Sequence, residues 1–327
     1  MASRPYVPES WIAMQAQLRK SIAHELPQTR VRSADRRRAF VRRKVVPWLF
    51  VLPILLINLA VVAGPALSAV YYAMTDWNGI GAANWVGLDN FRTLAVDSAF
   101  RRAFRNNVIW LAMFLTIPIA MALIAASLLA PVRRGALVFR MALFIPYVLP
   151  SVITAALWRG LLSPDRGVPA LLTNWGVPGF DRAFLGAPDT VLPAIGFVDN
   201  WHWWGFLMVL FLASMQNIPP DLYESARLDG ASRWQEFRDV TLPGIRPTFV
   251  FMILMTTIWS FLTFDYIWIL TQGGPAGASE VLAVLVFKEA FRNFNAGYAA
   301  AIGLTMSFFV GCVIAVFQVL RRRGWEI

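Results

Sequence analysis

Lysine and histidine are scarce in this chain of 327 residues, and each shortage excludes a class of function. The only lysines are Lys20, Lys44 and Lys288, and they follow Arg, Arg and Phe. A phosphate-binding P-loop needs Gly-Lys followed by Ser or Thr, so the chain contains no such loop. Any nucleotide hydrolysis must therefore come from another subunit. His24 and His202 are too few to predict a metal site, and no Ser-His-Asp or paired-carboxylate spacing predicts an enzyme.

Charge and cysteine are also scarce. Charged residues make up 15% of the chain and hydrophobic residues 57%, whereas a soluble domain is about one quarter charged. The single cysteine, Cys312, excludes a disulfide within the chain and lies in the last apolar segment, where we expect a buried thiol that serves packing. The composition is that of a membrane protein.

Six apolar segments are long enough to cross a bilayer, because a span takes about 20 residues. The predicted fold class is therefore an all-α polytopic membrane protein with six transmembrane helices. Pro53 and Pro65 predict a kink or tilt in the first segment, and Arg140 and Arg159 lie close to the two ends of the third. The six segments are about 46–72, 108–130, 136–158, 192–214, 248–270 and 299–320.

Basic residues gather on one side of these spans. With the amino terminus inside the cell, 21 of the 30 Lys and Arg residues are cytoplasmic, as the positive-inside rule expects. The net charge of +11 then needs no nucleic-acid partner, because anionic lipid attracts the basic run before the first span. We predict cytoplasmic termini and the outward segments 75–105, 160–190 and 271–297. The domain prediction is a basic extension over 1–44, a membrane domain over 45–322 and a tail over 323–327.

One long polar stretch, residues 217–247, interrupts the apolar second half; we call it the 217–247 loop. Pro219 and Pro220 suit the first turn of a helix, which is predicted to run from Asp221 to about Leu228. Gly230 permits the left-handed backbone that ends such a helix. The pattern predicts a short helix and a turn at the cytoplasmic surface.

A second short helix is predicted directly after that turn. Ser232 and Gln235 have the spacing of a capping box. Trp234 and Phe237 then share one face, and Pro243 and Pro247 are expected to end the helix before the next apolar run. The local chemistry alone favours an ordinary loop with two helical turns.

The 217–247 loop resembles the EAA signature of ABC importer permeases. Ser225 replaces the usual second alanine, which exchanges one small residue for another. The matching residues are Glu224, Ala226, Asp229, Gly230, Ala231, Phe237, Leu242 and Pro243. The resemblance extends over residues 45–322 and is to the binding-protein-dependent carbohydrate permeases of the maltose, trehalose and glycerol-3-phosphate type. Its other stretches are 87–91, 218–223, 270–275, 290–291 and 297–301.

This resemblance implies a function and a set of partners. The loop Gly273-Gly274-Pro275 resembles that of the first of two permease types. The implied function is a permease subunit that imports a sugar or sugar-like solute across the bacterial cytoplasmic membrane, without being an enzyme. The implied partners are a second permease, two copies of a cytoplasmic ATPase that binds ATP and Mg, and an extracytoplasmic solute-binding protein or lipoprotein. The chain itself is expected to hold no cofactor.

The solute path is predicted on the fourth and fifth spans. Asp199 and Asp265 are ionisable residues within spans, which are functional candidates by default. Trp203 and Phe206 offer an aromatic surface for the apolar faces of a sugar ring. Thr256, Trp259, Ser260 and Thr263 follow i, i+3, i+4, i+7, so they would share one helical face. The resemblance places sugar-binding positions of the maltose importers at the same spacing; close helix packing is the alternative.

Two other questions stay open at the level of sequence. Residues 9–26 predict a helix with Trp11, Met14, Leu18 and Ile22 on one face, which either lies on the membrane or packs on the bundle. The alternative functions are a secondary transporter, a membrane scaffold, and an ABC permease for a solute that is not a sugar. Secondary transporters commonly carry internal repeats, which this sequence lacks.

Overall fold

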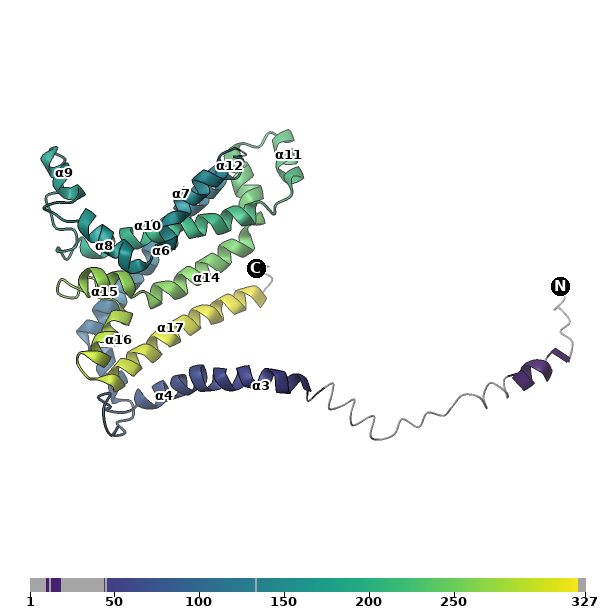
Figure 1. Ribbon diagram of the computed structural model, residues 1–327, viewed down its shortest axis with the longest axis horizontal. Helices are drawn as coiled ribbons and strands as arrows, with labels where there is room; N and C mark the ends of the chain where they lie inside the picture. The colour runs from purple at the N-terminus through teal and green to yellow at the C-terminus, as the bar shows by residue number, and fades with distance from the viewer. Residues whose placement is uncertain (1–9, 12, 19–43, 45, 133, 323–327) are drawn as a thin grey trace. The chain divides into compact units, whose positions relative to one another are not determined.

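The computed structural model describes residues 10–11, 13–18, 44, 46–132 and 134–322 (Figure 1). The chain divides into two compact units, Met1–Pro65 and Ala66–Ile327. The described residues are almost all helical, and they form no strand beyond an isolated bridge between Thr75 and Trp85. The all-α fold class is confirmed.

The first unit contains the start of the first apolar segment. Helix α3 (Val46–Asn58) is followed by a π-helical turn, Leu59–Ala63, and then by α4 (Gly64–Tyr72), most of which belongs to the second unit. Residues 10–11 and 13–18 are helical, with Trp11, Met14 and Leu18 exposed. The rest of the helix predicted over 9–26, including Ile22, lies outside the described residues.

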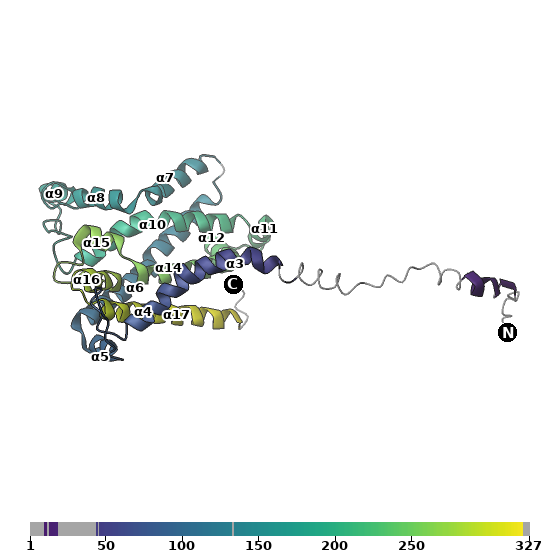
Figure 2. The ribbon, with the colours of Figure 1, turned by 60° about the horizontal axis from the view of Figure 1, so that its bottom comes forward.

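The second unit is built around α6 (Ser98–Leu129) and α10 (Val191–Met215), which pack along each other. The buried side chains at their centre include Trp110, Ile195 and Phe211. Helices α14 (Arg246–Leu262) and α17 (Ala296–Arg322) continue the layer, and α10, α14 and α17 run side by side in Figures 1 and 2. The shorter helices are α5 (Asp89–Val96), α7 (Ala136–Val148), α8 (Ser151–Leu161), α9 (Val168–Asn174), α11 (Pro220–Leu228), α12 (Arg233–Gln235), α13 (Leu242–Gly244), α15 (Asp265–Thr271) and α16 (Leu282–Phe291).

Within the described part of the chain, four helical segments are long and apolar enough to cross a membrane: Pro47–Tyr72, Ser98–Leu129, Arg246–Thr271 and Ala296–Arg322. A bent pair, α7 with α8, makes a fifth if it counts as one span. The predicted fourth span corresponds to α10, which contains the polar residues Asp199, Asn200 and His202 and is not among these segments. The polytopic class is thus confirmed, while the count of six stays a prediction.

The third predicted span, 136–158, is bent sharply in its middle. Helices α7 and α8 meet at an angle of 96°. Leu149 has an extended backbone, with ψ of 135°, and precedes Pro150. A residue before proline is pushed out of the helical region by a clash with the proline ring, which explains the break.

The fifth predicted span, 248–270, is also interrupted. Helix α14 ends at Leu262, and Thr263 has an extended ψ of 127° before α15 begins at Asp265. Thr263 therefore lies beyond the helix whose face it was predicted to share.

Cys312 was expected to be buried, but it is exposed on α17. An exposed thiol on a membrane helix can contact lipid or another subunit.

Candidate functional site

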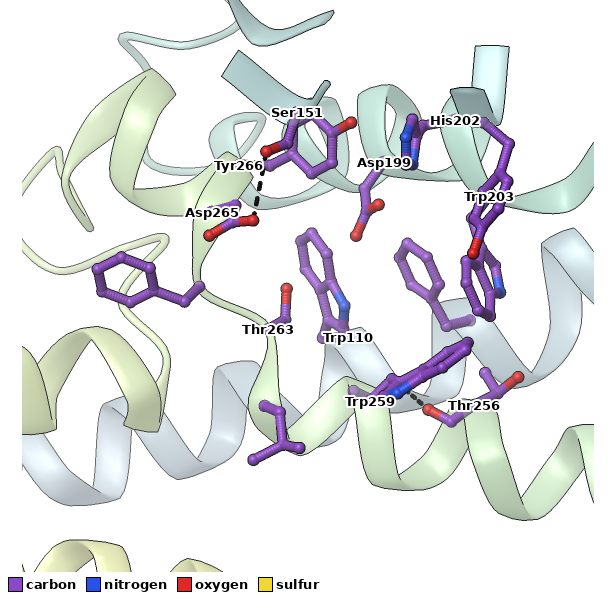
Figure 3. A pocket seen from close by; sticks show the side chains of 15 residues that line it. Trp110, Ser151, Asp199, His202, Trp203, Thr256, Trp259, Thr263, Asp265 and Tyr266 are labelled. Carbon is purple, nitrogen blue, oxygen red and sulfur yellow. Dashed lines mark hydrogen bonds between the residues drawn. The ribbon is translucent and has the colours of Figure 1, made fainter. Parts of the chain in front are cut away.

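A cavity of about 360 Å³ lies where the two broken spans meet α6 and α10 (Figure 3). Asp199 from α10 and Trp259 from α14 both line it. Its aromatic lining includes Trp110, Phe114, Tyr147, Trp203, Trp259 and Tyr266, and its polar lining comprises Ser151, Asp199, His202, Thr256, Ser260, Thr263 and Asp265. This combination of ring faces and polar groups is typical of a ligand pocket.

Five of the six residues predicted on the solute path line this cavity: Trp203, Thr256, Trp259, Ser260 and Thr263. The indole rings of Trp203 and Trp259 meet edge to face with their centroids 4.3 Å apart. Phe206 is the exception. It lies 5.2 Å from Trp203 between ring centroids and lines a neighbouring apolar cavity of about 500 Å³, which Trp259 also borders.

Some polar atoms at the cavity are satisfied and others are not. The Ser260 hydroxyl donates to the Thr256 carbonyl at 2.8 Å within the helix. Thr256 is 2% exposed, and its Oγ1 has no hydrogen-bonding partner among the described residues. The same holds for Nε1 of Trp203. A buried polar atom without a partner is costly, so both atoms are available to a bound solute.

Several lining residues come from segments that the sequence argument did not connect. Ser151 begins α8, and its hydroxyl donates to the Asp265 carboxylate at 3.3 Å, which joins the two broken spans. Nε2 of His202 lies 3.2 Å from the Leu149 carbonyl, at the break between α7 and α8. Leu149 followed by Pro150 was the sequence signal for this break. Trp110 and Tyr147 gave no comparable signal, because aromatic residues are common throughout the spans.

Asn107 of α6 holds the interrupted fifth span in place. Its Nδ2 donates to the Ser260 carbonyl at 2.8 Å, and its Oδ1 accepts from the Leu282 N–H at 2.8 Å. Ser260 is in the last turn of α14, and Leu282 begins α16. Because the last carbonyls and first N–H groups of helices lack partners within the helix, Asn107 caps two helices at once.

Asn106, the preceding residue, fixes the segment before α16. Its Nδ2 lies within hydrogen-bonding distance of the carbonyls of Gly277, Ala278 and Glu280, at 3.2, 3.1 and 2.8 Å. Glu280 is 5% exposed and pairs with Lys288. Residues 277–280 closely follow the Gly-Gly-Pro stretch, so α6 anchors the end of that loop.

The 217–247 loop folds into two short helical parts around Gly230, whose φ of +81° is the left-handed conformation predicted for it. Helix α11 precedes the turn. The predicted capping box is present, with the Ser232 side chain accepting from the Gln235 N–H and the Gln235 side chain accepting from the Ser232 N–H. Trp234 and Phe237 stack with centroids 5.6 Å apart. The capping box, the left-handed glycine and the aromatic pair are thus present where the sequence predicts them.

An ion pair closes the loop on itself. Arg227 Nε donates to Glu236 Oε1 at 2.8 Å, which joins α11 to the second part. The hydrogen bond from Arg227 lowers the pKa of the Glu236 carboxyl. The Tyr223 hydroxyl lies 3.0 Å from the Thr241 hydroxyl and makes a second tie between the two parts.

The remaining signature residues lie along this loop. Glu224 and Ala226 are on α11, Asp229 caps its end, and Ala231 follows the turn. Phe237 lies in a π-helical segment, Glu236–Thr241. The helical segment passes Pro243 and ends at Gly244, before Pro247, so of the two prolines predicted to stop it Pro243 does not. Pro243 instead follows Leu242 in the first turn of α13, where a residue without an N–H leaves no bond unmade.

Comparison with known proteins shows which family contains a chain with this cavity and this loop. Residues 118–324 match the family described as the inner membrane component of binding-protein-dependent transport systems. The chain belongs to this family. The matched region contains the 217–247 loop, most of the cavity lining and all six residues predicted on the solute path.

Individual relatives cover most of this permease. A probable ABC transporter permease of Bacillus subtilis, YurN, is 32% identical over 85% of the chain and 96% of its own length. NgcF of Streptomyces coelicolor, a diacetylchitobiose uptake permease, is 35% identical over 74% of this chain and 72% of its own. A crystal structure of a bacterial ABC transporter that imports alginate, an acidic polysaccharide, has a chain that matches with a TM-score of 0.78 at 25% identity, covering 88% of this chain and 99% of that one.

The permease is thus a multi-pass membrane subunit of an ABC importer and is not itself an enzyme. Such importers work with an ATPase and a solute-binding protein. The described residues contain no group of three or more His, Cys, Asp and Glu side chains placed to hold a metal ion.

Proposed function

We propose that this permease carries a sugar or sugar-like solute through the cavity between its two broken spans. The observation that carries the proposal is the lining itself: Trp203 and Trp259 in edge-to-face contact, beside the unpartnered hydroxyl of Thr256. Sugar rings present apolar C–H faces to aromatic rings and hydroxyls to polar atoms. The relative that takes up diacetylchitobiose supports a saccharide as the solute.

We also propose that the 217–247 loop docks in a cleft of the ATPase. Trp234 is 67% exposed and stacks on Phe237, so the loop presents an aromatic surface to a partner. Glu224 and Asp229 would supply its fixed charges. In this arrangement the loop and both termini are cytoplasmic, and each importer has a second permease and two ATPase copies. The outward segments then meet an extracytoplasmic solute-binding protein or lipoprotein.

Replacing Trp259 with alanine tests the solute path. Loss of a fully buried large side chain removes about 1.5–3 kcal/mol of apolar contact, and Trp259 is 37% exposed, so the expected loss is toward the lower end. At about 1.4 kcal/mol per tenfold, solute affinity should fall about tenfold. Transport per assembled complex is measured in proteoliposomes, with Trp48→Ala, which changes an exposed tryptophan of α3, as the control.

The two interpretations of Trp259 predict different results. If it contacts the solute, Trp259→Ala lowers transport per assembled complex and leaves assembly with the ATPase intact. If it serves only helix packing, the yield or thermal stability of the complex falls and each assembled complex transports normally. The second result would remove these residues from the proposed path.

A further inference from the structure

The ionisable side chains that line the cavity are mostly acidic. They are Asp199 from α10, Asp265 from the start of α15, and His202, one turn after Asp199 (Figure 3). None of the lining residues is Lys or Arg. In a chain with 30 basic and 19 acidic residues, the cavity is therefore lined by acidic and not by basic side chains.

Two arginines of the surrounding segments contact other groups. Arg159 of α8 donates to the backbone carbonyl of Ile269. Arg292 lies over the Trp268 ring, 4.7 Å from its centroid, and donates to the Gln272 side chain. Neither arginine lines the cavity, so the two aspartates are not neutralised by a cation within it.

The cavity also offers matched hydrogen-bonding groups. Thr256 Oγ1 and Trp203 Nε1 are buried without a partner in the described structure, and they can donate to solute oxygens. Asp265 accepts one hydrogen bond, from Ser151 at 3.3 Å, whereas a carboxylate has about four acceptor positions. Its remaining positions suit hydroxyl or ammonium donors.

A negatively charged solute would be repelled in this setting. A carboxylate or phosphate taken from water needs a cation or several N–H donors to replace its hydration. Here it would find two carboxyl groups and no Lys or Arg among the lining residues, and like charges a few ångströms apart repel more strongly near protein than in water.

We propose that Asp199 and Asp265 make the cavity selective for saccharides without negative charge. It takes neutral and amino sugars and rejects uronates and sugar phosphates. In this respect the permease differs from its structural neighbour, whose transporter imports an acidic polysaccharide. The selectivity rests on the proposed function of sugar import and names the substrate class at the same site.

The test is direct binding to the assembled importer in lipid nanodiscs without the solute-binding protein, because that protein would impose its own selection. Three trisaccharides of similar size serve as probes: the trimers of N-acetylglucosamine, glucosamine and galacturonic acid, which are neutral, cationic and anionic. Calorimetry gives the dissociation constants. We expect the anionic trimer to bind at least about tenfold more weakly than the neutral one, a gap that repulsion between partly buried charges readily produces.

The double variant Asp199→Asn with Asp265→Asn should remove most of the difference in affinity between the neutral and the anionic trimer, which we call the gap. Asparagine keeps the shape and removes the charge. Asp165→Asn, an exposed aspartate after α8, is the matched control and should keep the gap. Equal affinity of the wild-type complex for the neutral and anionic trimers overturns the selectivity, as does an unchanged gap in the double variant. Failure of all three trimers to bind overturns the sugar function as well, and is distinct from binding without charge preference.

Discussion

Asn107 offers the most direct test of how the interrupted fifth span is held beside the cavity. The residue is 1% exposed, and its side chain makes two hydrogen bonds to backbone groups that no helix can satisfy: the Ser260 carbonyl and the Leu282 N–H, each at 2.8 Å. Replacing Asn107 with alanine leaves both groups buried and unpaired. Each such group costs about 1–3 kcal/mol, so the expected loss is about 2–6 kcal/mol in the free energy of unfolding.

Thermal unfolding of the assembled complex in nanodiscs measures this loss. At about 2–4 °C per kcal/mol for larger domains, the midpoint should fall by roughly 10 °C. Asn107→Leu distinguishes the loss of the hydrogen bonds from the loss of side-chain packing. Leucine fills the space that asparagine occupies but makes neither hydrogen bond. Both variants should therefore lose stability.

The control is Asn174→Ala, since Asn174 is exposed at the end of α9 and a surface change is typically within about 0.5 kcal/mol. A midpoint for Asn107→Ala equal to that of the wild type would refute the capping role. If Asn107→Leu is as stable as the wild type while Asn107→Ala is not, packing and not hydrogen bonding explains the effect.

Three further predictions concern the 217–247 loop. Gly230→Val should give an assembled complex with lost or uncoupled ATPase activity, because a β-branched residue is strained at φ of +81° although no atom would clash with its Cβ; normal uptake would contradict this. The lowered pKa of Glu236 beside Arg227 means that their ion pair stabilises the loop above the ordinary glutamate pKa of about 4.3, and that this contribution is lost as pH falls through the lower folded value. Amide hydrogen exchange in the loop, corrected for its intrinsic pH dependence, should show weaker protection at pH 3 than at pH 7 in the wild type and no such change in Arg227→Gln; equal behaviour of the two proteins would contradict it. In a Cys312→Ala background, a cysteine at Ser232 should react with an impermeant thiol reagent only from the cytoplasmic side, and labelling from outside would reverse the proposed topology.

The sequence determined the fold class and the local form of the 217–247 loop. Long apolar runs have no stable alternative to helices in a bilayer, because every backbone group must be paired internally. The loop was equally predictable, since its capping box, its glycine turn and its aromatic pair depend on residues a few positions apart. Ser232 and Gly230 could be interpreted from their immediate neighbours.

The breaks within the spans were harder to predict. Pro150 was visible in the sequence, but proline within a span is also tolerated in an unbroken helix when neighbours satisfy the freed groups. The break after Leu262 has no proline at all. At this break a side chain from another helix, Asn107, donates a hydrogen bond to the Ser260 carbonyl in the last turn of α14.

Only the tertiary structure decided what the cavity contains. Periodicity placed Thr256 and Trp259 on one helical face, but it also assigned Thr263 to that face, although the helix ends before it. The meeting of Ser151 with Asp265 joins residues 114 positions apart, and no local pattern encodes such a pairing. Local order depends on neighbours along the chain and can be predicted from them, whereas the charge and shape of a cavity depend on which distant segments pack together.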